Sequence, residues 1–152
     1  MALPNVFDKC VSDQLMARIN KLTPETNPLW GKMSAPLMLA HCNVTYEMCY
    51  QDIHPKPGFI GKILLNLFVK NQVISEKNYG KNLRTGPQFL VSDNKDFEKE
   101  KQRLIDYINR TQKLGANAFE QKESHSFGKL SSNEWNNMFY KHLNHHLEQF
   151  GL

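Results

Sequence analysis

Apolar residues recur every three or four positions in four separate stretches of the chain, which is the spacing of one face of an α-helix. The first stretch follows Asp8, which can cap a helix, and ends at the Thr-Pro pair of residues 23–24. The others cover residues 34–51, 94–114 and 131–152. Each of these helices must bury one face, and few strand signals compete with them. The pattern therefore predicts an all-α fold, an antiparallel four-helix bundle.

An insertion separates the second and third predicted helices. Residues 59–69 are apolar and predict a short extra helix, and residues 75–87 have two glycines, a proline and little periodicity, which predicts a long surface loop. Long loops often carry function, so we expect the insertion 59–87 to govern substrate selection. The short helix has two interpretations: a cover over the bundle, or a contact in a homodimer.

Length, charge and cysteine usage limit the class of protein. A chain of 152 residues, 40% apolar and 22% charged, has the size and composition of one globular domain spanning 1–152. The net charge of +4 is mild and scattered, which disfavours nucleic-acid binding. The three cysteines, Cys10, Cys42 and Cys49, are odd in number and lack CxxC spacing, which argues against a disulfide framework and a thiolate zinc site. No apolar run is long enough for a membrane span or a secretion signal. We therefore expect a cytoplasmic protein with reduced cysteines and no membrane association.

Three histidines are predicted to point into the core. On a helical projection His41 lies in the middle of an apolar stripe, and His142 and His146 share an apolar arc of the last helix, one turn apart. An i, i+4 pair of imidazoles can reach a common ion, and a third from a facing helix completes a site. The sequence thus predicts one divalent metal ion between the three. The alternative for each is a core histidine hydrogen-bonded to a carbonyl group.

Five further polar residues are candidates for the surroundings of such a site. His125 precedes the last helix and could serve as an outer ligand or proton shuttle, or could anchor its loop by a hydrogen bond. His145 is expected at the rim, and Thr45 and Gln149 on inner arcs are expected to contact ligand residues or substrate, or to be satisfied core groups. His54, beside a proline, is expected to be a solvated turn residue.

Three segments of the chain resemble a known family. The run HLNHHLEQ of residues 142–149 is similar to the last-helix signature of the DinB-like superfamily, and WGKMSAPLMLAH of residues 30–41 is similar to a segment of its second helix. The segment SHSFGKL of residues 124–130, followed by Glu134 and Trp135, resembles one uncharacterised subfamily. The resemblance implies a four-helix bundle, often dimeric. It also implies a divalent metal bound by His41, His142 and His146.

The resemblance also suggests classes of function. Members include metal-dependent transferases that use low-molecular-weight thiols, and related hydrolases, and the family name implies no DNA binding. We expect a metal-dependent hydrolase or thiol-dependent transferase that acts on a small molecule and carries zinc or nickel, which imidazole suits. No motif identifies the substrate. The alternative is a nonenzymatic helical-bundle interaction protein in which the histidines are structural.

Overall fold

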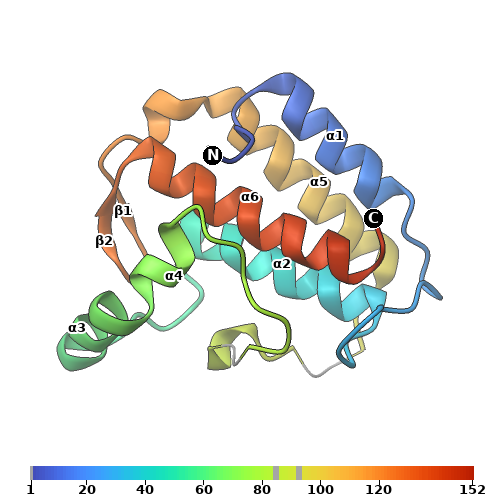
Figure 1. Ribbon diagram of the computed structural model, residues 1–152, viewed down its shortest axis with the longest axis horizontal. Coiled ribbons are helices and arrows are strands. Elements are labelled where there is room, and N and C mark those ends of the chain that lie inside the picture. Colours follow the sequence, from blue (N-terminus) through green and yellow to red (C-terminus); the bar gives the residue numbers. More distant parts are fainter. Residues whose placement is uncertain (1, 84–85, 92–93) are drawn as a thin grey trace.

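The computed structural model describes residues 2–83, 86–91 and 94–152, and it is mostly helical (Figure 1). The helices are α1 (Lys9–Asn20), α2 (Ala35–Tyr50), α3 (Phe59–Phe68), α4 (Lys70–Ile74), α5 (Phe97–Leu114) and α6 (Ser132–Gln149). Two short 3-10 helices, η1 (Pro87–Phe89) and η2 (Ala116–Phe119), and two short strands, β1 (Lys122–Ser124) and β2 (Gly128–Leu130), complete the structure. The predicted all-α class is confirmed. The predicted loop 75–87 includes residues 84–85, which lie outside the described residues.

The four longest helices pack on one another. α2 contacts α5 and α6, and α1 contacts the same two helices (Figure 1). α2 is the most buried of them, with buried residues along most of its length from Ala35 to Glu47. Polar side chains on such a helix are removed from water, so their burial is costly unless they find partners inside the protein.

Capping residues define the helix ends. At α6 the predicted capping box is present, since Ser131 Oγ accepts from the Glu134 amide at 3.3 Å and Glu134 Oε2 accepts from the Ser131 amide at 2.8 Å. Asp96 accepts from the Lys99 amide at 2.9 Å, so α5 begins three residues after the predicted position 94. Asp8 precedes α1 as predicted, but its carboxylate accepts from the Asn5 side chain and caps no helical amide.

The helix α4, the two strands and the two 3-10 helices were not predicted from the sequence. α4 is a single short helix held against α6, where Asn137 donates to the Ile74 carbonyl and the Lys141 ammonium donates to the carbonyls of Gln72 and Ser75. The strands β1 and β2 form an antiparallel hairpin just before α6. α4 and the hairpin are both short, and tertiary contacts rather than local propensity specify them.

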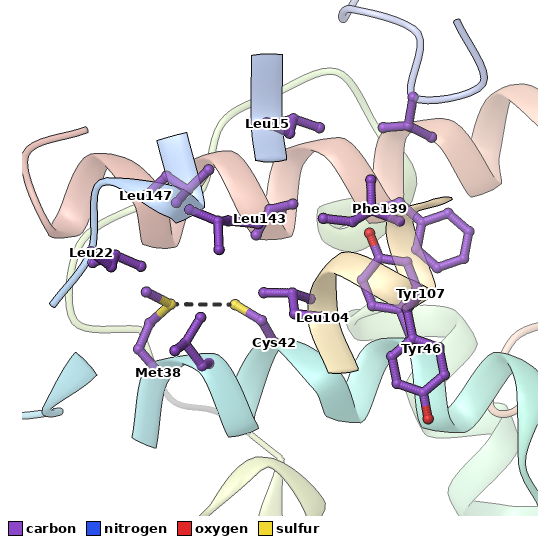
Figure 2. Packing of buried hydrophobic residues seen from close by; sticks show 14 of the residues in the cluster. Leu15, Leu22, Met38, Cys42, Tyr46, Leu104, Tyr107, Phe139, Leu143 and Leu147 are labelled. Atoms are coloured by element: carbon purple, nitrogen blue, oxygen red, sulfur yellow. Dashed lines mark hydrogen bonds between the residues drawn. The ribbon is translucent and has the colours of Figure 1, made fainter. Parts of the chain in front are cut away.

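The core lies where α1, α2, α5 and α6 meet (Figure 2). Tyr46 of α2 is stacked between Tyr107 of α5 and Phe139 of α6, with ring centroids 5.5 and 4.8 Å apart and ring planes within 6° of parallel. These contacts fix the position of α2 along both of its neighbours. The leucines in the same cluster, including Leu15, Leu104 and Leu143, are almost fully buried.

A buried polar network joins α2 to α5. Glu47 of α2 is paired with Arg103 of α5, which also donates to Glu100 at 2.7 Å, and Asn43 donates to Glu100 at 2.8 Å. His54 lies 2.7 Å from Glu47, so the expectation of a solvated turn residue is wrong. His54 instead connects the turn after α2 to this network through Glu47. The carboxylate of Glu47 compensates for the partial burial of the imidazole.

α3 does not cover the bundle, which was one of the two roles predicted for it. It projects from the rest of the protein (Figure 1), and none of its residues is buried. Leu65 borders an internal cavity, but Phe59 on the outward side is 82% exposed and Phe68 is 76% exposed. In the part of the chain that is described, no helix is both long enough and apolar enough to cross a bilayer.

The position of Leu104 in the core predicts the effect of truncating it. Leu104→Ala removes a fully buried side chain and should lower the free energy of unfolding by about 2–5 kcal/mol in urea denaturation. The matched control is Leu114→Ala on the same helix, where the side chain is 48% exposed and the loss should stay below about 1 kcal/mol. Equal losses in the two variants would contradict this description of the core.

Candidate metal centre

α2 and α6 bring three imidazoles together. His41 lies in the middle of α2, and His142 and His146 lie one turn apart on the face of α6 that meets it. One ring nitrogen from each residue falls within 4.8 Å of the other two. His41 Nε2 and His142 Nε2 are 3.0 Å apart, and the ring centroids of His41 and His146 are 4.5 Å apart. The three histidines predicted from the helical projection thus form one cluster that could hold a metal ion.

The spacing can be compared with that of a metal site. Zinc binds imidazole nitrogen at roughly 2.0–2.1 Å, so two nitrogens on one ion are at most about 4.2 Å apart. The nitrogens of the cluster lie at 3.0 Å in the closest pair and within 4.8 Å overall. Side-chain shifts of less than about 1 Å would bring all three within that limit.

Hydrogen bonds fix the protonation of two of the rings. His41 Nδ1 is 3.0 Å from the Phe89 carbonyl oxygen, which can only accept. His146 Nδ1 is 2.8 Å from Gln149 Oε1, and the Gln149 amide is oriented by its own donation to the Trp30 carbonyl at 2.8 Å. Each Nδ1 therefore carries the proton, and each Nε2 presents a lone pair.

His142 can adopt either tautomer. Its Nδ1 lies 3.0 Å from Thr45 Oγ1, a hydroxyl that can donate or accept, and its Nε2 faces the lone pair of His41 Nε2. If Thr45 donates, His142 Nε2 carries a proton and bonds to His41. If Thr45 accepts, two lone pairs face each other at 3.0 Å, an arrangement that requires a cation between them.

The cluster is electrically neutral at neutral pH. Burial lowers the pKa of His142 well below its ordinary value, and the neighbouring His146 and His41 add to this effect. Burial also lowers the pKa of His146 to about 3, and it lowers the pKa of His41 despite the bond to Phe89. Unprotonated imidazole is the form that binds metal ions.

The segment before α2 supports the cluster from outside. The carbonyl of Trp30 holds Gln149, as described, and the Leu29 amide donates to the Gln149 carbonyl at 2.7 Å. Gly31 has a φ of +78°, and a Cβ at this position would lie 2.7 Å from the Gln149 amide nitrogen. Glycine is needed here because a side chain would displace the amide that orients His146.

The other predicted residues surround the cluster without joining it. His145 is half-buried at the rim, as expected, with its ring 6.0 Å from Trp30 and 5.7 Å from Tyr79. Thr45 and Gln149 each bond to a histidine of the cluster. His125 lies 2.9 Å from the Ser126 hydroxyl and 3.2 Å from the His54 carbonyl, which is the loop-anchoring arrangement.

Two important groups were not found from the sequence. These are the backbone carbonyls of Phe89 and Trp30, which set the orientation of His41 and, through Gln149, of His146. Every residue has a carbonyl, so a sequence gives no signal for such a role.

A cavity of about 710 Å³ opens onto the cluster. It is bordered by α2 and α6, by α3 and α4, and by residues of the segments 79–83 and 86–91, so described residues of the predicted insertion do form part of the wall. This volume lies within the range of small-molecule binding sites, which is roughly 300–1,000 Å³. A bound molecule could reach the imidazoles from it.

No known protein family, curated protein or solved structure matches this chain.

The lowered pKa values predict an acid-sensitive fold. An imidazole whose pKa is lower in the folded state than the ordinary value of about 6.5 binds its proton preferentially after unfolding. The free energy of unfolding of chelator-treated protein should therefore fall as the pH drops from about 6.5 toward 5, by at most about 1.4 kcal/mol per pH unit for an imidazole that stays unprotonated in the folded protein. His146, with a pKa of about 3, should contribute across this whole window.

The variant His146→Gln isolates this contribution. Urea denaturation of this variant at a series of pH values should show a smaller fall of the free energy of unfolding with decreasing pH than the native protein shows. The difference should be about 1.4 kcal/mol per pH unit, which is the effect of binding one proton fewer on unfolding. Stability at pH 8 supplies the reference for each protein, since the imidazoles are neutral there in both states. Identical slopes for the two proteins would contradict the assignment.

Proposed function

We propose that the protein binds one divalent metal ion, zinc or nickel, through His41, His142 and His146. We further propose that it is a metal-dependent hydrolase or a thiol-dependent transferase that acts on a small molecule. One observation carries the proposal: three neutral ring nitrogens lie within 4.8 Å of one another at a cavity. Three neutral imidazoles suit zinc or nickel and leave coordination positions open.

The residues around the ligands support this role. Phe89, Gln149 and Thr45 each bond to the Nδ1 of one histidine, so the opposite nitrogen is directed into the cluster. Such outer hydrogen bonds orient the rings of metal-binding histidines and raise their basicity. When bound, the ion would polarise a substrate group or lower the pKa of a water or thiol. The cavity would hold the substrate and exclude bulk water.

We extend the proposal to the fold family. The packing of α1, α2, α5 and α6 around one core supports an antiparallel four-helix bundle of the DinB-like type. The ligands lie on α2 and α6, the helices to which the resemblance assigns them. All three cysteines are free, which supports a cytoplasmic location.

Metal analysis tests the main proposal. Untagged protein should carry close to one equivalent of zinc or nickel by elemental analysis. His142→Ala and His146→Ala should each reduce this to near zero, because two imidazoles cannot hold the ion through purification. Full metal loading of both variants would overturn the proposal.

His145→Ala is the matched control for these variants. His145 is adjacent to His146 in the sequence, and its ring lies 5.2 Å from that of His146, but it is not one of the three clustered ligands. The variant should keep its metal. Loss of metal from His145→Ala to the same degree would show that the effect is not specific to the three proposed ligands.

The predicted homodimer is supported by the exposed apolar residues of α3. Six of its apolar side chains are 45–82% exposed: Phe59, Ile60, Ile63, Leu64, Leu67 and Phe68. At 100° per residue they cover one half of the helix surface. Contiguous exposed apolar patches of this kind mark contacts between proteins. We propose that this face, the α3 surface, contacts the same face of a second copy, since isologous dimers are the commonest assembly.

Sedimentation equilibrium tests the dimer. The native protein should sediment as twice the monomer mass of 17.7 kDa at micromolar concentration, and Leu67→Glu should be monomeric because it introduces a charge into the α3 surface. Lys62→Gln is the control: it lies on the same helix outside the apolar half, and the variant should remain dimeric. A monomeric native protein, or a dimeric Leu67→Glu, would contradict the proposed contact.

A further inference from the structure

The cavity is a slot that follows α2 and α6. The two helices run in opposite directions, because His41 contacts His146 while Tyr46 contacts Phe139. The lining residues of α6 extend from Trp135 to Gln149, which is about 21 Å at 1.5 Å per residue. An elongated molecule fits a slot of these proportions better than a compact one.

The two ends of the slot differ in polarity. Around the imidazoles the wall includes Thr45 and Gln149, whose polar groups face the cluster. Toward the start of α6 the helices contribute apolar residues: Met48 of α2, Met138 of α6, Leu65 of α3, Val73 of α4, and Val69 just before α4. The hairpin adds Ser124, His125 and Ser126 to this end, but their side chains hydrogen-bond to one another or to backbone groups. The bonds from α6 to the carbonyls of α4 hold this apolar wall in position. The molecule that fits therefore has a polar head and an apolar tail.

The charge around the slot is positive. Among the lining residues that the structure describes, Lys32 is the one charged side chain and none is a carboxylate. Two further ammonium groups lie against wall residues: Lys81 is 4.3 Å from the ring centre of Trp30, and Lys141 is 4.8 Å from that of Tyr79. Within the described chain Lys141 donates to backbone carbonyls and forms no ion pair. Such a potential attracts an anionic head and repels a cationic one.

We infer that the slot binds an amphipathic anion, of which a linear monocarboxylate is the simplest, with its head beside the imidazole cluster and its tail toward Met48, Leu65 and Val69. The inference rests on the proposed function in one respect, because the head lies against the proposed metal centre. The position of the tail and the preference for an anion follow from the residues that line the slot and do not depend on a metal ion.

Calorimetric titration with three ligands of equal chain length tests the inference. Decanoate, decanol and decylamine share the tail and differ in the charge of the head. In metal-loaded protein, decanoate should bind at one site and at least tenfold more tightly than decylamine, with decanol between them. Equal affinity for decanoate and decylamine would overturn the inference.

A pair of tryptophan variants tests the position of the tail. Val69→Trp places an indole in the apolar end and should weaken decanoate binding at least tenfold. Leu114→Trp adds the same group on α5, where the native side chain is 48% exposed and does not line the slot, and should leave the affinity unchanged. Unchanged decanoate affinity in Val69→Trp would overturn the assignment of the tail.

Metal content, measured on the same samples, separates this inference from the proposed function. Val69→Trp should keep its metal, because its three imidazoles are intact. Protein that is metal-free as purified and still prefers decanoate would contradict the metal proposal and support the ligand class. Metal-loaded protein without a preference for decanoate would contradict the ligand class alone.

Discussion

The structure depends on the packing of α2 against α6. The stacking of Tyr46 on Phe139 sets the relative position of the two helices, and the same position places His41 against His142 and His146. A shift by one helical turn would move one helix by about 5.4 Å and separate the imidazoles. The position of α2 along α6 thus determines both the apolar contacts of the core and the geometry of the histidine cluster.

Burying three imidazoles imposes a second constraint, because each unsatisfied polar group inside a protein costs about 1–3 kcal/mol. The chain satisfies them with the Phe89 carbonyl, the Thr45 hydroxyl of α2 and the amide of Gln149, which lies three residues after His146 on α6. The bond to Phe89 holds the segment 86–91, which begins at the end of the predicted insertion, at the cavity, and the bond from Gln149 to Trp30 holds the segment before α2. The histidines therefore organise the walls of the slot as well as its polar centre.

Helical periodicity was sufficient to predict α1, α2, α3, α5 and α6 and to direct the three histidines inward, since each feature depends on positions within one helix. Features that depend on contacts between distant segments were not predicted. α4 is held by Lys141 and Asn137, more than sixty residues away, and the hairpin strands have three residues each. The exposure of α3 was not predictable either, because an apolar helix has the same sequence pattern whether or not another element covers it.

Charge connects the proposed metal centre with the proposed ligand. Imidazole is a neutral ligand, so His41, His142 and His146 would leave both positive charges of a divalent ion uncompensated. The surroundings add Lys32, Lys81 and Lys141 and, among the described lining residues, no carboxylate. Positive charge in a cavity with apolar walls is costly unless an anion accompanies it. An anionic head at the cluster would supply that charge, so the proposed metal centre and the proposed amphipathic anion would complement each other in one site.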